Sequence, residues 1–569
     1  MKKRPAASVR EWPDGPLDSE VFDWPDHILE RLLSKPILKE RLITALSGID
    51  IHVTTDYSGM ECPGEALRCN GMAVRSALGA ECDIRPIHFR RCCDIADIPK
   101  AMLLAMHEDT VCVFPDLNAR LPLEVRNMLD ALEPEEGMST EEHVAARQNQ
   151  YKFLQSRKRD VFTRGATSWC ERHGRECLTL PQPDEGHCRK GGGPSSSSPA
   201  GPLQKALRVH FAGACCQGWS SMGSRQMFAH PSERPHAIWV TERERAGQLD
   251  LEDLFILEQS PRYKWEDKLS NLSDTHELRR LLISPEMLGI LSRRLRAYVI
   301  GISKISLQWI GASPERVQEE FDAIFRVALR ASARAFMNAE MPEVEEFHRR
   351  RAELQGNFWP RDFAFEPAYR ATLQHPEKKS DLLMECMGLN CFKRFEAYEA
   401  ARSKAGLDQC FSDLQQNESY AAPVSSSMPV ELRNTLVVSH VARRLLTPLE
   451  VLSQHGFHVH DKTAMKWGLS PVRGAIESAG VAAWQIGKVS GNGQSLPVVQ
   501  AVWLYALTHT KVKHVQRSVP EIRLGRRGGT VFFDGGDGWS SSDESGGNAS
   551  GDGAGAKKAR LNCMASVVD

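Results

Sequence analysis

The sequence lacks long apolar runs, and its positive and negative charges nearly cancel. No stretch approaches the roughly 20 consecutive apolar residues that a membrane-spanning helix needs. The N-terminal segment Met-Lys-Lys-Arg-Pro-Ala-Ala-Ser is basic but has no apolar core of the kind that a signal peptide carries. With 72 basic and 73 acidic residues the formal net charge is −1, so any polyanionic partner would have to bind a local basic surface. We therefore expect a soluble intracellular protein that does not interact with membranes.

The sequence also lacks the cysteine pattern of a secreted disulfide framework. Its 15 cysteines are scattered over 569 residues, which favours reduced thiols inside the cell. Hydrophobic residues make up 41% of the chain and charged residues 25%, which is sufficient for one large domain and a smaller lobe. Two stretches have too few apolar residues to fold: a linker of Gly, Ser and Pro at residues 191–201 and a tail rich in Gly, Ser and Asp that includes residues 535–556.

A strand, a glycine-containing turn and a helix follow an N-terminal extension. The β-branched run Ile51–Thr55 predicts a short strand, Tyr57-Ser58-Gly59 a turn, and the residues up to about Leu78 a helix. This order is typical of the first unit of a nucleotide-binding α/β sheet, in which glycine lets the backbone approach a ligand. Because such turns are common, the unit alone is a weak signal.

Two aspartates follow the next predicted strands. Asp94 comes after a strand predicted at about residues 84–90, and Asp116 comes after the apolar run Thr110–Phe114. A carboxylate in either position accepts hydrogen bonds from a ribose hydroxyl or an adenine amine. Each is equally well explained as an ordinary turn aspartate.

A cysteine follows the end of an apolar run in the stretch Val209–Gly223. The run breaks at Gly213 and opens into a loop with Cys216, Gln217 and two serines, which predicts a strand that carries a thiol to the carboxyl edge of a sheet. Small neighbours and hydrogen-bonding groups make Cys216 a candidate nucleophile. The alternative is a buried, inert thiol, which is the commoner state of a lone cysteine.

The stretch Phe-Ala-Gly-x-x-Cys-Gln-Gly-Trp-Ser around Cys216 resembles the catalytic loop Gly-x-Pro-Cys-Gln-x-Phe-Ser of the DNA cytosine-5 methyltransferases. Further along the chain, Glu258-Gln-Ser resembles the family's Glu-Asn-Val. Arg294 and Arg296 stand where the family has the arginines of Gln-x-Arg-x-Arg. These blocks occur in the family's order.

Three other blocks extend the resemblance to both ends of the predicted domain. Tyr57-Ser58-Gly59 resembles the family's Phe-x-Gly-x-Gly cofactor motif. Residues 444–457 resemble Arg-x-Leu-Thr-x-x-Glu-x-x-x-x-Gln-Gly-Phe, and residues 489–498 resemble Gly-Asn-x-Val-x-x-Pro-Val, which in the family closes the cofactor pocket. Several blocks in the same order make a chance match improbable.

The resemblance implies methyl transfer from S-adenosyl-L-methionine to C5 of cytosine in DNA. Cys216 would add to C6, and Glu258 would neutralise charge that develops near N3. Arg294 and Arg296 suit a pyrimidine carbonyl and backbone phosphate. The target base would be flipped out of double-stranded DNA, and the enzyme would act in the nucleus.

The resemblance also implies the binding residues, and no metal is expected among them. The implied substrate contacts are Gln217 and Ser220. The implied cofactor contacts are Tyr57, Ser58, Gly59, Asp94, Asp116 and Asn492.

The expected fold class is α/β, with a Rossmann-like methyltransferase sheet that has helices on both faces, a smaller target-recognition lobe and a disordered C-terminal tail. The expected parts are an N-terminal extension (residues 1–48), a catalytic core (49–303, with an insertion and flexible linker at 117–204), a target-recognition region (304–439), the C-terminal part of the core (440–511) and the tail (512–569). The oligomeric state is not predicted.

A cysteine-rich segment lies in the insertion. Cys170, His173, Cys177, His187 and Cys188 include enough groups for a zinc site, but their spacing matches no common zinc finger. We therefore favour a cysteine-rich loop without metal.

Two other functions remain open at the level of sequence. An RNA cytosine-5 methyltransferase would use the same loop, because the loop reads the base rather than the sugar. A catalytically silent nucleic-acid-binding scaffold is suggested by Glu61, Cys215 and Ser292, which stand where the family usually has other residues. The presence of both Cys216 and Glu258 argues against the scaffold.

Overall fold

The computed structural model describes residues 12–180, 206–219, 224–292, 294–354, 356–375, 377, 380–386, 444 and 446–513. Contacts divide the chain into Met1–Val515 and Gln516–Asp569, and the second unit lies wholly outside the described residues. The predicted linker and the predicted tail beyond Lys513 also lie outside them. Within the described part of the chain, no helix combines the length and the apolar character that crossing a membrane requires.

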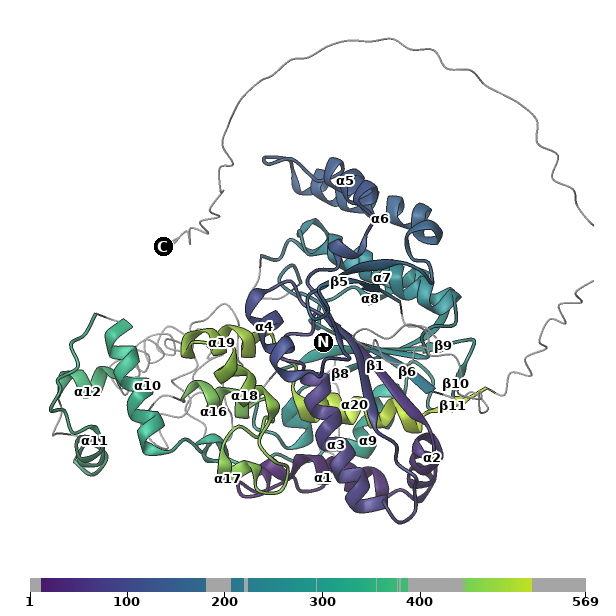
Figure 1. Ribbon diagram of the computed structural model, residues 1–569. Helices are drawn as coiled ribbons and strands as arrows, with labels where there is room; N and C mark the ends of the chain where they lie inside the picture. Colours follow the sequence, from purple (N-terminus) through teal and green to yellow (C-terminus); the bar gives the residue numbers. More distant parts are fainter. Residues whose placement is uncertain are drawn as a thin grey trace, which may run out of the picture. The chain divides into compact units, whose positions relative to one another are not determined.

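A seven-stranded mixed sheet forms the centre of the first unit (Figure 1). The strand order is β3-β2-β1-β6-β7-β9-β8, in which β9 runs antiparallel to both β7 and β8 and the other neighbours are parallel. The expected Rossmann-like sheet is confirmed. The strands are β1 (Asp50–Asp56), β2 (Ile87–Cys93), β3 (Cys112–Phe114), β6 (Ala206–Gly213), β7 (Leu254–Gln259), β8 (His276–Ile283) and β9 (Arg296–Ser303).

The sheet changes direction between β1 and β6. From β1 the chain builds outward through β2 to β3, and it then returns to place β6 on the other side of β1. Asp56 pairs with Ala212, so the carboxyl ends of β1 and β6 lie side by side. Open α/β sheets bind ligands in the crevice outside such a reversal point, and this is where the Tyr57 and Cys216 loops begin.

Helices cover both faces of the sheet, as expected (Figure 1). The most deeply buried of them is α20, in which all 13 residues are buried and which therefore packs on every side rather than along one stripe. One face carries α1 (Trp24–Leu33), α2 (Pro36–Leu46), α3 (Cys62–Leu78), α9 (Val317–Phe325) and α20 (Leu496–Thr508). The other carries α5 (Leu123–Ala131), α6 (Thr140–Val161) and α7 (Glu233–Gln248).

Segments outside the predicted catalytic core also pack into this unit. The N-terminal α1 joins it through Trp24, whose indole N–H donates to the Gly456 carbonyl at 3.0 Å. β10 (Leu307–Trp309) pairs with β11 (Thr510–Val512), and the Tyr505 hydroxyl donates to Glu320 of α9 at 2.7 Å. The structure therefore places the first part of the predicted 304–439 region against the main core.

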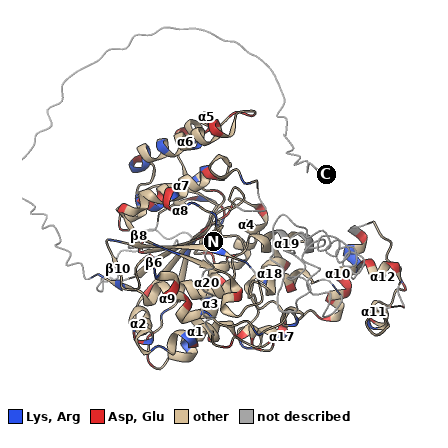
Figure 2. Ribbon diagram, turned by 180° about the vertical axis from the view of Figure 1, so that it is seen from behind, with Lys and Arg blue, Asp and Glu red and all other residues tan. Residues whose placement is uncertain are grey.

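A separate small apolar cluster lies later in that region. It joins α10 (Met341–Leu354), α11 (Phe365–Gln374) and α12 (Asp381–Cys386). Within the described residues, the other α-helices and strands are α4 (Asp97–Met106), β4 (Thr167–Cys170), β5 (Arg175–Leu178), α8 (Trp265–Lys268), α16 (Pro448–Ser453), α17 (Asp461–Ala464), α18 (Pro471–Ser478) and α19 (Ala483–Asn492). Figure 2 shows that basic and acidic positions are interspersed along the helices, in keeping with the small net charge.

Candidate active site

The loop that carries Cys216 is held by the residues that follow Glu258. The Gln259 amide donates to the Ala214 carbonyl at 3.0 Å, and the Ser260 hydroxyl donates to the Trp219 carbonyl at 3.0 Å. Within the loop, the Trp219 backbone N–H donates to the Cys216 carbonyl at 2.9 Å. The end of β7 therefore fixes both ends of the loop that begins at the end of β6.

Trp219 anchors the same loop in the core beneath it. Its indole N–H donates to Glu233 at 2.9 Å, and its ring packs edge-on against Tyr263, with 5.7 Å between the ring centroids. The preceding Gly218 has no room for a side chain, since a Cβ there would lie 2.7 Å from the Cβ of His230. Residues 214–219 therefore form a tightly packed turn that carries the thiol.

Three charged side chains gather around the thiol. Glu258 is 6% exposed and pairs in register with Gly213, which places it beside the start of the Cys216 loop. Arg296 forms an ion pair with it, with 2.9 Å between Nε and Oε1. Arg294 is also buried and donates to the Gly491 carbonyl at 3.1 Å, which connects this cluster to the C-terminal end of α19.

The protonation of Cys216 follows from these neighbours. Burial raises the pKa of the Cys216 thiol, Glu258 raises it further, and Arg296 and Arg294 oppose both effects. Burial, with Arg296 as a second cause, lowers the pKa of Arg294 to about 10, so its guanidinium stays charged at neutral pH. The thiol is therefore mainly protonated in the free protein. Additional positive charge nearby would lower the pKa of the thiol and favour the reactive thiolate.

Replacing Glu258 by Gln should make Cys216 react at lower pH. Removing the carboxylate removes one of the causes that raise the pKa of the thiol. The measurement is the rate of iodoacetamide labelling at Cys216 against pH, followed by mass spectrometry in a Cys215→Ser background. Arg296→Gln should move the profile to higher pH, and Glu266→Gln, on the exposed side of α8, should leave it in place. A Glu258→Gln profile at the wild-type or a higher pH would contradict this account of the thiol.

A narrow pocket lies at the reversal point of the sheet. The space between its atoms, including its open mouth, is about 290 Å³. The turn after β1, the end of β6 and residues 492–494 line it. Gly59 has a φ of +56°, and a Cβ there would meet no atom within 4 Å, so its backbone faces open space.

Three polar side chains around this pocket hold the loops through hydrogen bonds, and a fourth has no hydrogen-bond partner among the described residues. The Ser58 hydroxyl donates to the Cys93 carbonyl at 3.1 Å, and Asp94 accepts from the Gly59 backbone N–H at 2.9 Å. Asp116 accepts from the Asn118 backbone N–H at 3.0 Å. The Tyr57 hydroxyl is buried and has no hydrogen-bond partner among the described residues. A ligand with a polar group would satisfy it.

Tyr57 also connects the pocket to the cysteine loop. Burial raises the pKa of its hydroxyl, and Asp56, Cys215 and Asp116 are among the charges that raise it further. These groups are therefore close to one hydroxyl, although they come from the end of β1 and from the loops that follow β6 and β3. A cofactor in the pocket would lie next to the loop that carries Cys216.

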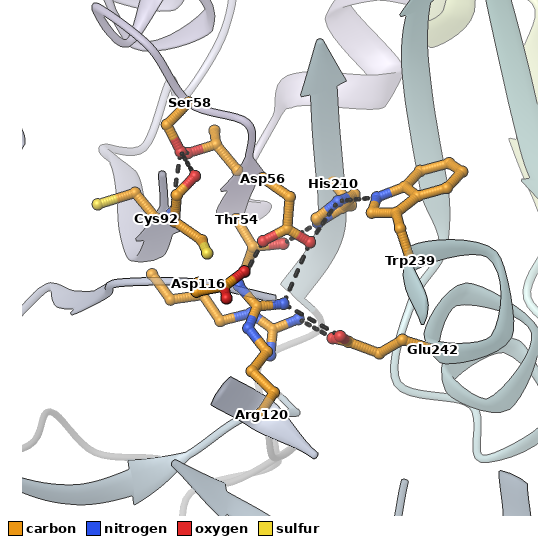
Figure 3. A network of polar contacts seen from close by, with 12 residues as sticks. Thr54, Asp56, Ser58, Cys92, Asp116, Arg120, His210, Trp239 and Glu242 are labelled. Atoms are coloured by element: carbon orange, nitrogen blue, oxygen red, sulfur yellow. Dashed lines mark hydrogen bonds and ion pairs between the residues drawn. The ribbon is translucent and has the colours of Figure 1, made fainter. Parts of the chain in front are cut away.

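A buried charge network supports the end of β1 (Figure 3). Arg120 forms an ion pair with Asp56 and donates to Glu242 at 3.0 Å, and all three side chains have 0% exposure. Burial alone would raise the pKa of Glu242, but Arg120, Arg243 and Arg91 lower it to about 2. The carboxylate stays charged, and the network ties the residue before Tyr57 to α7.

His210 extends this network to β6 (Figure 3). Its Nε2 accepts from the Trp239 indole N–H at 2.9 Å, and its Nδ1 lies 2.8 Å from the Thr54 hydroxyl. Burial, with Arg243 as the next cause, lowers the pKa of His210 well below its usual value. The ring is therefore neutral with its proton on Nδ1, and it joins β1, β6 and α7 below the pocket.

The structure brings most of the sequence-predicted site residues into two adjoining groups. Cys216 lies with Glu258, Arg294 and Arg296. The pocket beside them is lined by Tyr57, Ser58, Gly59 and the exposed Asn492, while Asp94 and Asp116 hold the loops after β2 and β3. Gln217 is exposed on the cysteine loop, and Ser220 lies outside the described residues.

Sequence analysis missed several residues that position these groups. Gln259 and Ser260 stand directly after Glu258, and their polar character within an apolar run was the available signal. Gln494 lies opposite Gly213, where a Cβ would be 2.8 Å from its amide nitrogen. Arg120 and Glu242 gave no local signal, because an ion pair between distant segments leaves no spacing pattern.

Of the comparisons with known proteins, only the comparison with solved structures found matches. No protein-family model matches the sequence, and no curated protein matches it either. Solved structures do match, and the three that follow are methyltransferases by name. They are the Entamoeba histolytica methyltransferase EhMeth (10% identity, TM-score 0.33, 80% of this chain and 97% of that chain), the S. pombe Dnmt2 methyltransferase (12%, 0.36, 80% and 97%) and a proposed DNA modification methyltransferase of an E. coli prophage (11%, 0.35, 81% and 99%).

Proposed function

We propose that the protein is a cytosine-5 methyltransferase that uses S-adenosyl-L-methionine and acts on DNA in the nucleus. The observation that carries the proposal is the convergence of Cys216, Glu258, Arg294 and Arg296 beside a pocket at the reversal point of the sheet. A thiol, a carboxylate and two guanidinium groups are the set that covalent addition to a pyrimidine requires.

The residues of the pocket suit S-adenosyl-L-methionine. Tyr57 offers a buried hydroxyl that lacks a partner among the described residues, Gly59 leaves open space above its backbone, and Asn492 is among the residues that line the pocket. Asp94 and Asp116 follow β2 and β3, where carboxylates hold a ribose and an adenine amine. When bound, the cofactor supplies an electrophilic methyl group on a sulfonium.

The chain's own residues would then perform the covalent chemistry. The target cytosine must leave the helix stack, because its C5 and C6 are inaccessible while stacked. The Cys216 thiolate forms a bond to C6, Glu258 acts as the acid that gives a proton to N3 and holds the amino group, and the electron pair displaced from the C5–C6 double bond becomes available at C5. After C5 has taken the methyl group, the C5 proton passes to water, the electron pair left behind re-forms the C5–C6 double bond, the bond to C6 breaks to release the Cys216 thiolate, and N3 returns its proton to Glu258.

Arg294 and Arg296 would promote this step through their positive charges. Both oppose the rise in the pKa of Cys216, so they favour the thiolate. Arg296 also orients Glu258 through their ion pair, while Arg294 is fixed by the Gly491 carbonyl next to the pocket. The two arginines therefore connect the nucleophile, the carboxylate and the loop that closes the pocket.

A methyl-transfer assay tests the proposal and the choice of nucleic acid. The full chain is incubated with methyl-labelled S-adenosylmethionine and either duplex DNA or RNA of matched sequence, and the digested products are identified by mass spectrometry. The proposal predicts 5-methyldeoxycytidine from DNA. Label only in 5-methylcytidine from RNA would replace DNA by RNA as the substrate, and binding of the cofactor without transfer to either would favour the scaffold.

A further inference from the structure

Four metal-ligating side chains converge at the edge of the sheet, away from the cysteine loop. They are Cys112 of β3, Cys170 of β4, His173 in the turn that follows and Cys177 of β5. Their ligand atoms all lie within 4.8 Å of one another. The His173 Nδ1 atom is 3.6 Å from the sulfur of Cys112, 3.3 Å from that of Cys170 and 3.4 Å from that of Cys177.

These separations fit a tetrahedral zinc site. With Zn–S bonds of about 2.3 Å and Zn–N bonds of about 2.1 Å, tetrahedral geometry places a nitrogen and a sulfur ligand roughly 3.6 Å apart. Three cysteines and one histidine fill all four positions, which is the arrangement of a structural rather than a catalytic site. The cysteines are buried and the histidine is partly exposed, so the set is enclosed by protein.

The second nitrogen of His173 has the partner that a metal-ligating histidine needs. Its Nε2 lies 2.8 Å from the Asp109 carbonyl oxygen, so the ring proton belongs on Nε2. Nδ1 then has a free electron pair, and it is the atom that faces the three sulfurs. A ring nitrogen oriented by a backbone carbonyl is the usual outer-shell arrangement around zinc.

The local fold holds the ligands in this position. The turn after β4 is closed by the Gly174 backbone N–H, which donates to the Cys170 carbonyl at 2.9 Å, and Gly174 adopts a left-handed φ of +58°. The Glu171 backbone N–H donates to the Val113 carbonyl at 2.9 Å and joins the turn to β3. β3 is an edge strand of the main sheet, so the β4–β5 hairpin covers an edge that would otherwise be open.

We propose that Cys112, Cys170, His173 and Cys177 bind one zinc ion that clamps the β4–β5 hairpin to the edge strand β3. The sequence favoured a loop without metal because Cys170, His173 and Cys177 were combined with His187 and Cys188, which match no common pattern. The fourth ligand comes instead from β3, and His187 and Cys188 lie outside the described residues. The site is independent of the proposed methyl transfer.

Metal content tests the ligand set directly. The full chain, purified in reducing buffer without added metal, is expected to contain one zinc ion by mass spectrometry. Cys112→Ser, Cys170→Ser and Cys177→Ser should each lose most of it, whereas Cys188→Ser and the buried Cys82→Ser should keep it. Retention by Cys112→Ser together with loss from Cys188→Ser would overturn the proposed ligand set.

A second measurement avoids variants that fail to fold. Removal of zinc from the wild-type chain and refilling with Co²⁺ should give the thiolate-to-cobalt charge-transfer band and the strong visible bands of a tetrahedral site. Chelation should also speed hydrogen exchange in the β4–β5 hairpin more than in β1. Purified protein with neither zinc nor a cobalt spectrum, or with a disulfide among these cysteines, would overturn the proposal.

Discussion

Replacement of Cys216 by Ala is expected to lower the rate of methyl transfer by roughly a thousandfold or more, because a covalent step has no route without its nucleophile. The affinity for S-adenosylmethionine should change by less than about threefold, because Cys216 does not line the pocket at the end of β1. Single-turnover assays give the first quantity, and calorimetric titration of the cofactor gives the second.

Cys215→Ala is the matched control for that variant. Cys215 is the exposed neighbour of Cys216 in the same loop, so its loss removes a thiol without removing the proposed nucleophile. It should retain most of the activity. A fully active Cys216→Ala variant, or one that no longer binds the cofactor, would show that the nucleophile and the cofactor pocket are not divided as proposed.

Replacement of Arg120 by Met is expected to reduce the free energy of unfolding by about 3–5 kcal/mol. The substitution leaves Asp56 buried without its guanidinium partner, so the desolvation cost of that carboxylate is then uncompensated, whereas Glu242 keeps Arg91 and Arg243. Urea denaturation followed by tryptophan fluorescence measures the change. Since Asp56 precedes Tyr57, cofactor affinity should fall as well.

Arg157→Met is the control for Arg120→Met, because it removes an arginine from an ion pair at the surface. Arg157 forms an exposed ion pair with Asp160 on α6, and its removal should change stability by no more than about 0.5 kcal/mol. An Arg120→Met variant as stable as Arg157→Met would contradict the supporting role of the network. Adding Asp56→Asn to Arg120→Met should recover part of the loss, because one unpaired charge is removed.

The sequence predicted those strands whose own residues form a recognisable pattern. β1 and β6 are apolar or β-branched runs that end in polar loops, and their positions are confirmed within a few residues. β8 was missed because His276–Ile283 mixes charged residues with leucines, a composition typical of a helix. Antiparallel pairing with β9 along its whole length fixes it as a strand, and that partner is not visible locally.

For the site, too, the local sequence predicted some features, whereas contacts between distant segments of the chain determine the others. Cys216 and Glu258 stand at the ends of adjacent strands, so strand order alone predicts that they meet. The roles of Gln259 and Ser260 as supports of the loop depend on hydrogen bonds that composition does not specify. Cys112 could not be assigned to the histidine and cysteines of the β4–β5 hairpin, because the main sheet alone brings β3 to that hairpin.

Covalent trapping tests the central claim most directly. Fluorine at C5 cannot leave as a proton does, so a cytosine-5 methyltransferase stalls with its cysteine attached to C6 of 5-fluorocytosine. The full chain with S-adenosylmethionine should form a denaturant-resistant adduct with DNA that contains this base, and peptide mapping should place the bond at Cys216. An adduct with RNA alone would show that the substrate is RNA rather than DNA. No adduct with either nucleic acid, although the cofactor binds, would contradict the account of Cys216 as the nucleophile.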